Sequence, residues 1–170
     1  MSKLAWFIVA FLIAAGLVAT YFNRSANKEL LPYLGKWSGG FMVEQIDGKA
    51  NPALAKRASL TGYLQLYGSN DRFELRLNGE QQEVVVTGTW QLVSETQIEL
   101  KPEKYQIDDF GGAENRDPNL VYVPNDAVRA AYGKALALSL SSDKQTLIAP
   151  LSSIGPLTGI HQFKRVGSGR

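Results

Sequence analysis

Cysteine is absent from this chain of 170 residues. Its absence excludes disulfide bonds, thiolate chemistry and the lipid-modified cysteine of a bacterial lipoprotein. Histidine is nearly absent, because His161 is the only one. A lone histidine without a cysteine partner makes a zinc site improbable, so we expect neither a metal nor a cofactor. A chain without thiols also suits an exported domain.

An excess of charge of one sign is also missing from most of the chain. The formal net charge is +2, and Lys3 and Arg24 account for all of it, since the rest holds 16 basic and 16 acidic residues. The longest basic clusters are two pairs, at residues 56–57 and 164–165. Proteins that bind nucleic acid normally gather lysine and arginine on one face or stripe. The composition therefore argues against a nucleic-acid partner.

One long apolar run is present, at residues 4–22, and it holds no charge, proline or amide. A helix of that length, rising ~1.5 Å per residue, nearly spans a ~30 Å hydrocarbon layer. We therefore predict an N-terminal membrane anchor, a single transmembrane helix, at residues 1–23. A cleaved signal peptide is the alternative, but its apolar region is usually shorter and its cleavage site needs a small residue where Leu17 stands. A buried core helix fits less well, because the run is apolar on every face.

The anchor leads into a linker at residues 24–34, a domain at residues 35–166 and a flexible tail at residues 167–170. Basic residues flank the apolar run on both sides, so the positive-inside rule does not favour export. A short N-terminal tail followed directly by a β domain is nevertheless the usual plan of a signal anchor. We expect a single-pass protein of the inner membrane with its domain in the periplasm, close to the bilayer.

Alternation of apolar and polar residues dominates the domain, and it predicts strands with one buried and one wet face. The turns between most neighbours are short, which indicates an antiparallel meander. Such strands avoid exposed edges best by closing. The predicted fold is mainly β, an antiparallel up-and-down barrel of about eight strands. The predicted strands lie at residues 37–43, 60–67, 73–77, 84–92, 98–100, 136–140, 147–151 and 159–166.

Two inserts interrupt the predicted meander. The first spans residues 51–58, where Asn51 is a good N-cap and Pro52 suits the first helical position, so we predict a short helix. The second spans residues 103–134, is rich in Gly, Asp, Asn and Pro, and ends in a predicted helix at residues 126–132. Connections of this length are often lids or docking surfaces. The candidate lid or docking residues are Leu54, Asp108, Asp109, Phe110 and Tyr122.

A Gly-x-Trp motif, Gly35 to Trp37, opens the first predicted strand, and Lys164 or Arg165 lies near the end of the last. With the helical insert after the first strand, these features make residues 35–166 resemble the lipocalin-like (calycin) group of small β-barrels. The resemblance implies that the late basic side chain packs over Trp37 and closes the barrel base. A cation over a tryptophan face contributes ~0.5–2 kcal/mol. The resemblance also implies binding of an apolar ligand, although the disulfides usual in the group are missing.

No set of residues specifies a reaction. Ser152 or Ser153, His161 and Asp143 have the side-chain types of a nucleophilic triad, but no nucleophile-elbow sequence accompanies them. We expect His161 to be structural and the protein not to be an enzyme.

Acidic residues gather in the second insert, namely Asp108, Asp109, Glu114 and Asp117. Carboxylates in a glycine-rich loop can hold calcium, but this spacing does not match the twelve-residue calcium loop. A solvated loop is the favoured interpretation.

Tyrosines are candidates for a binding mouth, because each joins an apolar ring to a polar tip. Tyr63 and Tyr67 lie on the strand face opposite the leucines and would point outward. The inward residues are mostly leucine and valine, which can fill a narrow eight-stranded barrel. We slightly favour a filled core over a ligand cavity. The five candidates are Tyr63, Tyr67, Tyr105, Tyr122 and Tyr132.

The leading functional hypothesis is a membrane-anchored, non-enzymatic lipocalin-like domain that binds a small apolar ligand or lipid at the cell envelope. The ligand would enter the barrel mouth beneath the inserts at residues 51–58 and 103–134. The alternative is a structural or assembly accessory of an envelope protein complex, acting through its outer face and the second insert. An enzyme ranks third.

Overall fold

The computed structural model describes residues 29–68, 70–80, 82–110, 121 and 123–167. The chain divides into two units, Met1–Tyr33 and Leu34–Arg170. In the described part of the first unit, the Tyr33 N–H donates to the Leu30 carbonyl at 2.9 Å. The predicted anchor at residues 1–23 lies outside the described residues. Among the helices that are described, none has the length and apolar character needed to cross a bilayer.

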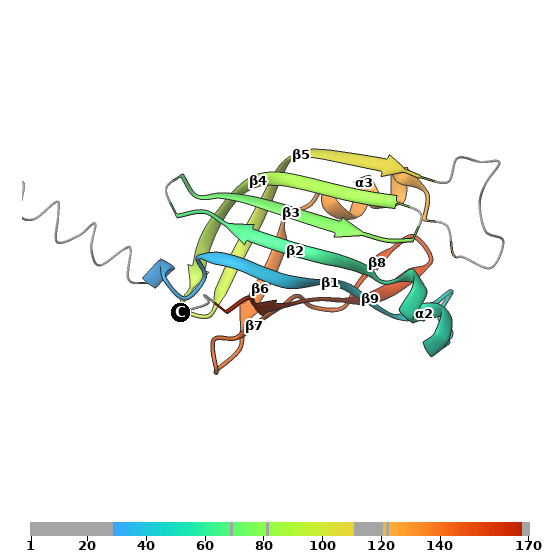
Figure 1. Cartoon of the computed structure of the whole chain (residues 1–170), viewed down its shortest axis with the longest axis horizontal. Helices are drawn as coiled ribbons and strands as arrows, with labels where there is room; N and C mark the ends of the chain where they lie inside the picture. The colour runs from blue at the N-terminus through green and yellow to red at the C-terminus, as the bar shows by residue number, and fades with distance from the viewer. Residues whose placement is uncertain (1–28, 69, 81, 111–120, 122, 168–170) are drawn as a thin grey trace, which may run out of the picture. The chain divides into compact units, whose positions relative to one another are not determined.

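The second unit is a closed antiparallel β-barrel, which confirms the predicted fold class of the domain (Figure 1). Neighbouring strands in sequence pair along the meander, and pairing of β1 with β9 closes the ring. The strands are β1 (Gly35–Ile46), β2 (Leu60–Leu66), β3 (Arg72–Asn78), β4 (Gln82–Ser94), β5 (Gln97–Asp109), β6 (Leu136–Leu140), β7 (Thr146–Ile148), β8 (Ser152–Ile154) and β9 (Leu157–Arg165).

The short strands β7 and β8 together fill one of the eight positions in the barrel. Both pair with β9, β7 near its end through Thr146 and Lys164, and β8 near its start through Ser152 and Gly159. Pro150 lies between them and has no N–H to donate to a ladder. The single strand predicted at residues 147–151 is therefore interrupted in the structure.

The barrel interior is filled by large apolar side chains. They occupy alternate positions along the strands, as the sequence pattern predicts, and each is at most 2% exposed. At that exposure these side chains pack closely against one another. The set is Trp37, Phe41, Leu64, Leu66, Phe73, Leu75, Leu77, Val84, Val86, Ile98, Leu100, Leu138, Leu147 and Phe163.

Two adjacent glycines let β1 approach both of its neighbours closely. A Cβ atom on Gly40 would lie 1.9 Å from the Leu60 carbonyl oxygen of β2. A Cβ atom on Gly39 would lie 2.0 Å from the Gln162 carbonyl oxygen of β9. Any larger residue at either position would push the backbones apart where the ring closes.

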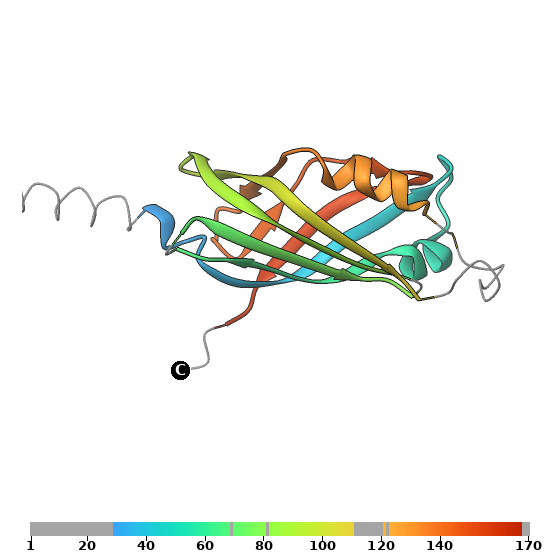
Figure 2. The same ribbon diagram turned by 90° about the horizontal axis from the view of Figure 1, so that it is seen from above.

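Two short helices lie where the sequence predicts them. Helix α2 (Pro52–Ala58) begins after Asn51, whose side chain accepts a hydrogen bond from the Leu54 N–H at 3.2 Å. It lies at one end of the barrel (Figure 1). Helix α3 (Asn125–Tyr132) lies along the outside of the barrel wall and buries Val128 and Tyr132 (Figure 2).

The predicted boundary of the second insert is wrong, because β5 continues to Asp109 and pairs with β4 throughout. The ladder accommodates Pro102 at an irregularity, where Gly88 pairs with Pro102 and Thr87 with Lys104. Most side chains from Lys101 to Asp109 are exposed or half-exposed. This stretch therefore lacks the apolar alternation that would have marked it as a strand.

Candidate functional site

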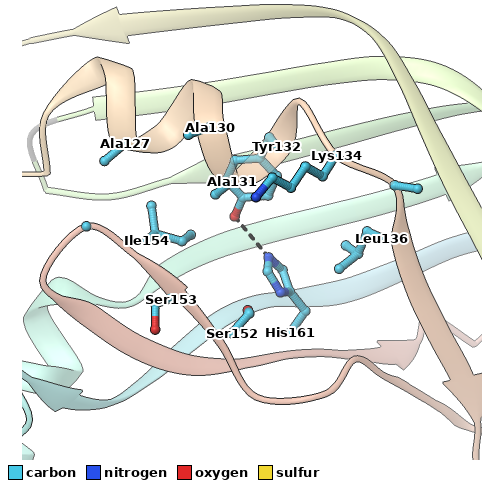
Figure 3. Close-up of a pocket in the computed structure, with 12 residues that line it drawn as sticks. Ala127, Ala130, Ala131, Tyr132, Lys134, Leu136, Ser152, Ser153, Ile154 and His161 are labelled. Carbon is cyan, nitrogen blue, oxygen red and sulfur yellow. Dashed lines mark hydrogen bonds between the residues drawn. The ribbon is translucent and has the colours of Figure 1, made fainter.

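A side pocket of about 500 Å³ lies where helix α3 faces β6, β8 and β9 (Figure 3). Strand β6 pairs with β7 only at Ser139 and Leu140. Within the described residues its first half has no ladder with β8, and α3 lies next to this seam. We call this space the α3 pocket. Its apolar lining includes Ala127, Ala130, Ala131, Leu136 and Ile154.

His161 forms part of the floor of the α3 pocket. It occupies an inward position of β9, between the inward-facing Gly159 and Phe163, and is 3% exposed. Its ring centroid lies 5.0 Å from that of Phe41 and 6.4 Å from that of Phe163. Burial lowers the pKa of the imidazole from 6.5 to about 4, because a cation is poorly solvated there. His161 is therefore neutral near neutral pH.

Tyr132, the last residue of α3, contacts His161 directly. Its hydroxyl oxygen lies 3.0 Å from His161 Nε2, and the two rings meet edge to face at 5.6 Å (Figure 3). The phenol is buried, and burial raises its pKa well above the ordinary value. The hydroxyl therefore keeps its proton and is available as a donor. This contact joins α3 to the core of the barrel.

Two buried polar atoms that belong to residues lining the α3 pocket have no hydrogen-bond partner within the described part of the chain. They are His161 Nδ1 and Ser152 Oγ. Leaving a buried polar group unpaired costs about 1–3 kcal/mol, so such atoms mark places where water or a ligand completes the bonding. Both residues line the pocket, and so does Lys134, which follows α3. A mostly apolar pocket with a few convergent polar groups is the usual form of a small-molecule site.

The structure brings Trp37 and Arg165 together at one end of the barrel. The two residues are opposite each other in the β1–β9 ladder, and the guanidinium carbon lies 5.1 Å from the tryptophan ring centroid. Arg165 also donates from Nη2 to the Leu34 carbonyl oxygen at 3.0 Å. Lys164 is opposite Ser38 and is exposed. Of the two basic candidates, Arg165 is therefore the one over Trp37.

The candidate lid residues do not border the α3 pocket. Leu54 is half-exposed in α2, and Asp108 and Asp109 are half-exposed at the end of β5 rather than in a loop. Phe110 follows β5 and is 62% exposed. Tyr122 lies outside the described residues.

The residues of the hypothetical triad are not assembled. Asp143 is in the turn between β6 and β7, where it accepts hydrogen bonds from the Ser141 hydroxyl at 2.5 Å and the Gln145 N–H at 2.9 Å. The Ser153 hydroxyl lies 3.2 Å from that of Thr158. His161 Nε2 is bonded to Tyr132. The structure thus places the acid away from the histidine.

The residues proposed for calcium do not form a cluster in the part of the chain that is described. There, no three histidine or acidic residues are grouped closely enough to hold a metal ion. Asp108 and Asp109 belong to β5, while Glu114 and Asp117 lie outside the described residues.

The candidate tyrosines do not share one mouth. Tyr63 donates to Glu74 Oε1 at 2.7 Å and lies under the Lys36 ammonium group, 4.1 Å from its ring centroid. Tyr67 and Tyr105 are 42% and 47% exposed. Among the described tyrosines of this set, Tyr132 alone lines the α3 pocket.

Sequence reasoning missed the pairing of Tyr132 with His161 and the role of Ser152. One signal was present, since His161 occupies an inward position between apolar neighbours in an alternating strand. A buried histidine requires a hydrogen-bond partner, which indicates a second polar side chain on whatever covers the strand.

The fold and the pocket define a small closed antiparallel barrel with a helix-covered side pocket. No protein-family model, curated protein or solved structure matches the chain.

Proposed function

We propose that this chain is a non-enzymatic, lipocalin-like barrel domain that binds a small apolar ligand carrying one polar group, in the α3 pocket. Anchoring by residues 1–23 in the inner membrane, with the domain in the periplasm, is part of the proposal. The observation that supports it best is a pair of buried atoms, His161 Nδ1 and Ser152 Oγ, which have no hydrogen-bond partner among the described residues and belong to two residues that line a mostly apolar pocket.

The proposed binding site is the α3 pocket, whereas the sequence predicts a ligand in the mouth of the barrel. The barrel interior is filled with side chains, whereas the α3 pocket has about 500 Å³ of space. Sites for small ligands typically have volumes of ~300–1,000 Å³. The lipocalin-like assignment rests on the barrel topology, the Gly35-to-Trp37 motif and Arg165 over Trp37.

Filling the pocket with a larger side chain is expected to abolish binding. In Ala131→Trp the indole would occupy the space between α3 and Ile154, and the affinity for octan-1-ol should fall by more than about tenfold, or ~1.4 kcal/mol. The affinity is measured by titration calorimetry of the full-length chain in amphipol.

Ala53→Trp is the matched control, because Ala53 is exposed on α2 and borders no part of the α3 pocket. This variant should bind as the unchanged chain does. Equal binding by the Ala131→Trp and Ala53→Trp variants would contradict the proposed site.

A second candidate function is an accessory of an envelope protein complex, and exposed aromatic side chains at the end of β5 favour it. Beyond Leu100, β5 pairs with β4 but with no strand of the described chain on its other edge. Tyr105 and Phe110 are 47% and 62% exposed there. Exposed aromatic side chains close to one another suit contact with a partner protein.

A photo-crosslinking residue placed at position 105 tests the accessory function in cells. It should produce one discrete crosslinked protein, because the partner would contact the exposed Tyr105 side chain. Val93, which is 54% exposed, is the control position and should give no such product. Crosslinks to lipid alone at position 105 would contradict a docking role for this edge.

A further inference from the structure

The hydrogen-bond pattern around His161 favours one position for the proton of the ring. The imidazole is neutral, so one nitrogen donates and the other accepts. The Tyr132 hydroxyl has His161 Nε2 as its hydrogen-bond partner in the described chain. If the phenol donates to Nε2, its proton is used and the ring proton resides on Nδ1. In the reverse arrangement the buried phenol proton and Nδ1 both lack a partner within the described chain, whereas the first arrangement leaves only the Nδ1 proton without one. Each buried polar group left unpaired costs about 1–3 kcal/mol.

With its proton on Nδ1, His161 has a buried N–H donor for which the described chain supplies no acceptor, and the residue lines the α3 pocket. Ser152 provides a second donor on the same side of the sheet, since it is opposite Gly159, two residues before His161 in β9. Lys134 adds an ammonium group to the lining. None of the described residues that line the pocket is acidic. The polar part of the pocket consequently offers donors and positive charge.

Apart from Ser153, the remaining walls of the pocket are apolar, and they belong to both sides of the seam. Ala127 and Ala131 come from α3, Leu136 from β6 and Ile154 from β8. Figure 3 shows these residues around the dashed Tyr132–His161 hydrogen bond. The small alanines leave room for an aliphatic chain between the helix and β8. One end of the pocket thus suits an anion and the rest suits a hydrocarbon.

We propose that the α3 pocket binds an amphipathic carboxylate, whose oxygens accept hydrogen bonds from His161 Nδ1 and Ser152 Oγ while Lys134 balances the charge. The aliphatic part lies against Ala131 and Ile154. This inference rests on the proposed function and names the chemistry of its ligand. Hydrogen bonds to a carboxylate are roughly twice as strong as neutral ones, and the ammonium group offsets part of the cost of removing the carboxylate from water.

Ligands that share one aliphatic chain and differ in head group test the inference. Octanoate, octan-1-ol, octylamine and octyl phosphate are titrated into the full-length chain in amphipol. Octanoate should bind at least about tenfold more tightly than octan-1-ol, because a hydrogen bond to a charged group contributes about 1.5–3 kcal/mol. It should also bind more tightly than octylamine and octyl phosphate.

Two variants assign the preference to named donors. Ser152→Ala and Lys134→Gln should each weaken octanoate binding by about fivefold or more, and each should weaken octan-1-ol binding by a smaller factor, because the alcohol carries no charge. The matched controls are Ser142→Ala and Lys56→Gln, which alter exposed residues outside the pocket and should bind octanoate normally. Thermal unfolding of each variant shows that it is folded.

Failure of the carboxylate inference can be distinguished from failure of the proposed function. Equal binding of octanoate and octan-1-ol, both lost in Ala131→Trp, would overturn the carboxylate inference and leave the proposed function standing. Stronger binding of octylamine or octyl phosphate would overturn it as well. Binding of none of the four to the folded chain would overturn both the inference and the proposed function.

Discussion

Replacing Trp37 by alanine is expected to lower the free energy of unfolding by about 3–5 kcal/mol, the range found when a core tryptophan is truncated. The ring is fully buried, is opposite Leu64 in β2 and Arg165 in β9, and lies beneath the guanidinium group. Removal of the ring would leave a cavity at the place where β2 and β9 both pair with β1. The loss would also free the Arg165 side chain from its ring contact.

Urea unfolding of the full-length chain in amphipol measures this change. Trp37→Phe is the informative companion, because it keeps an aromatic ring in the core and should cost less than the alanine variant. Val93→Ala changes an exposed residue and should have little effect. A loss below about 1 kcal/mol for Trp37→Ala would mean that the ring is not part of a packed core.

Acid is expected to destabilise the domain through His161 between pH 6.5 and about 4. The unfolded chain binds a proton at the ordinary pKa of 6.5, whereas the folded chain does so only near pKa 4. Within this window the unfolded state holds more protons, so the free energy of unfolding falls as the pH falls. The depressed pKa contributes about 3 kcal/mol to the free energy of unfolding. This contribution is complete above pH 6.5 and is lost as the pH falls to about 4.

The His161→Phe variant isolates this effect from the carboxyl groups that also titrate in acid. Tyr132 from α3 and Lys134 after it are the other titratable residues that line the pocket beside His161, and both remain in the variant. Urea unfolding at a series of pH values should show a steeper decline for the unchanged chain. Parallel profiles for the two proteins would contradict the buried, neutral state of His161.

The barrel could be predicted from sequence because its strands have one face in the core. Alternation is imposed wherever that face must be apolar, as at Leu64 and Leu66 in β2. The end of β5 could not be predicted as a strand, because its side chains from Lys101 onward are largely exposed and need no alternating pattern. Helix α2 could be predicted because Asn51 and Pro52 are local signals that do not depend on distant packing.

The candidate site could not be predicted in the same way. Tyr132 and His161 are 29 residues apart, and they meet only because α3 lies over the seam between β6 and β8. No local sequence pattern indicates that α3 packs over this seam. The residues chosen from the composition of the second insert, such as Asp108 and Phe110, do not line the pocket. Composition indicates that such residues are exposed, but it does not indicate which side chains contact one another.

Nitrogen NMR of the His161 ring tests the central claim most directly. The chain has one histidine, so labelling that amino acid with ¹⁵N gives signals from a single imidazole. Near neutral pH the account predicts a neutral ring with the proton on Nδ1, and a shift of the Nδ1 signal when octanoate is added. The Ala131→Trp variant should not show that shift. A proton on Nε2, or an Nδ1 signal that saturating octanoate leaves unchanged, would contradict the account.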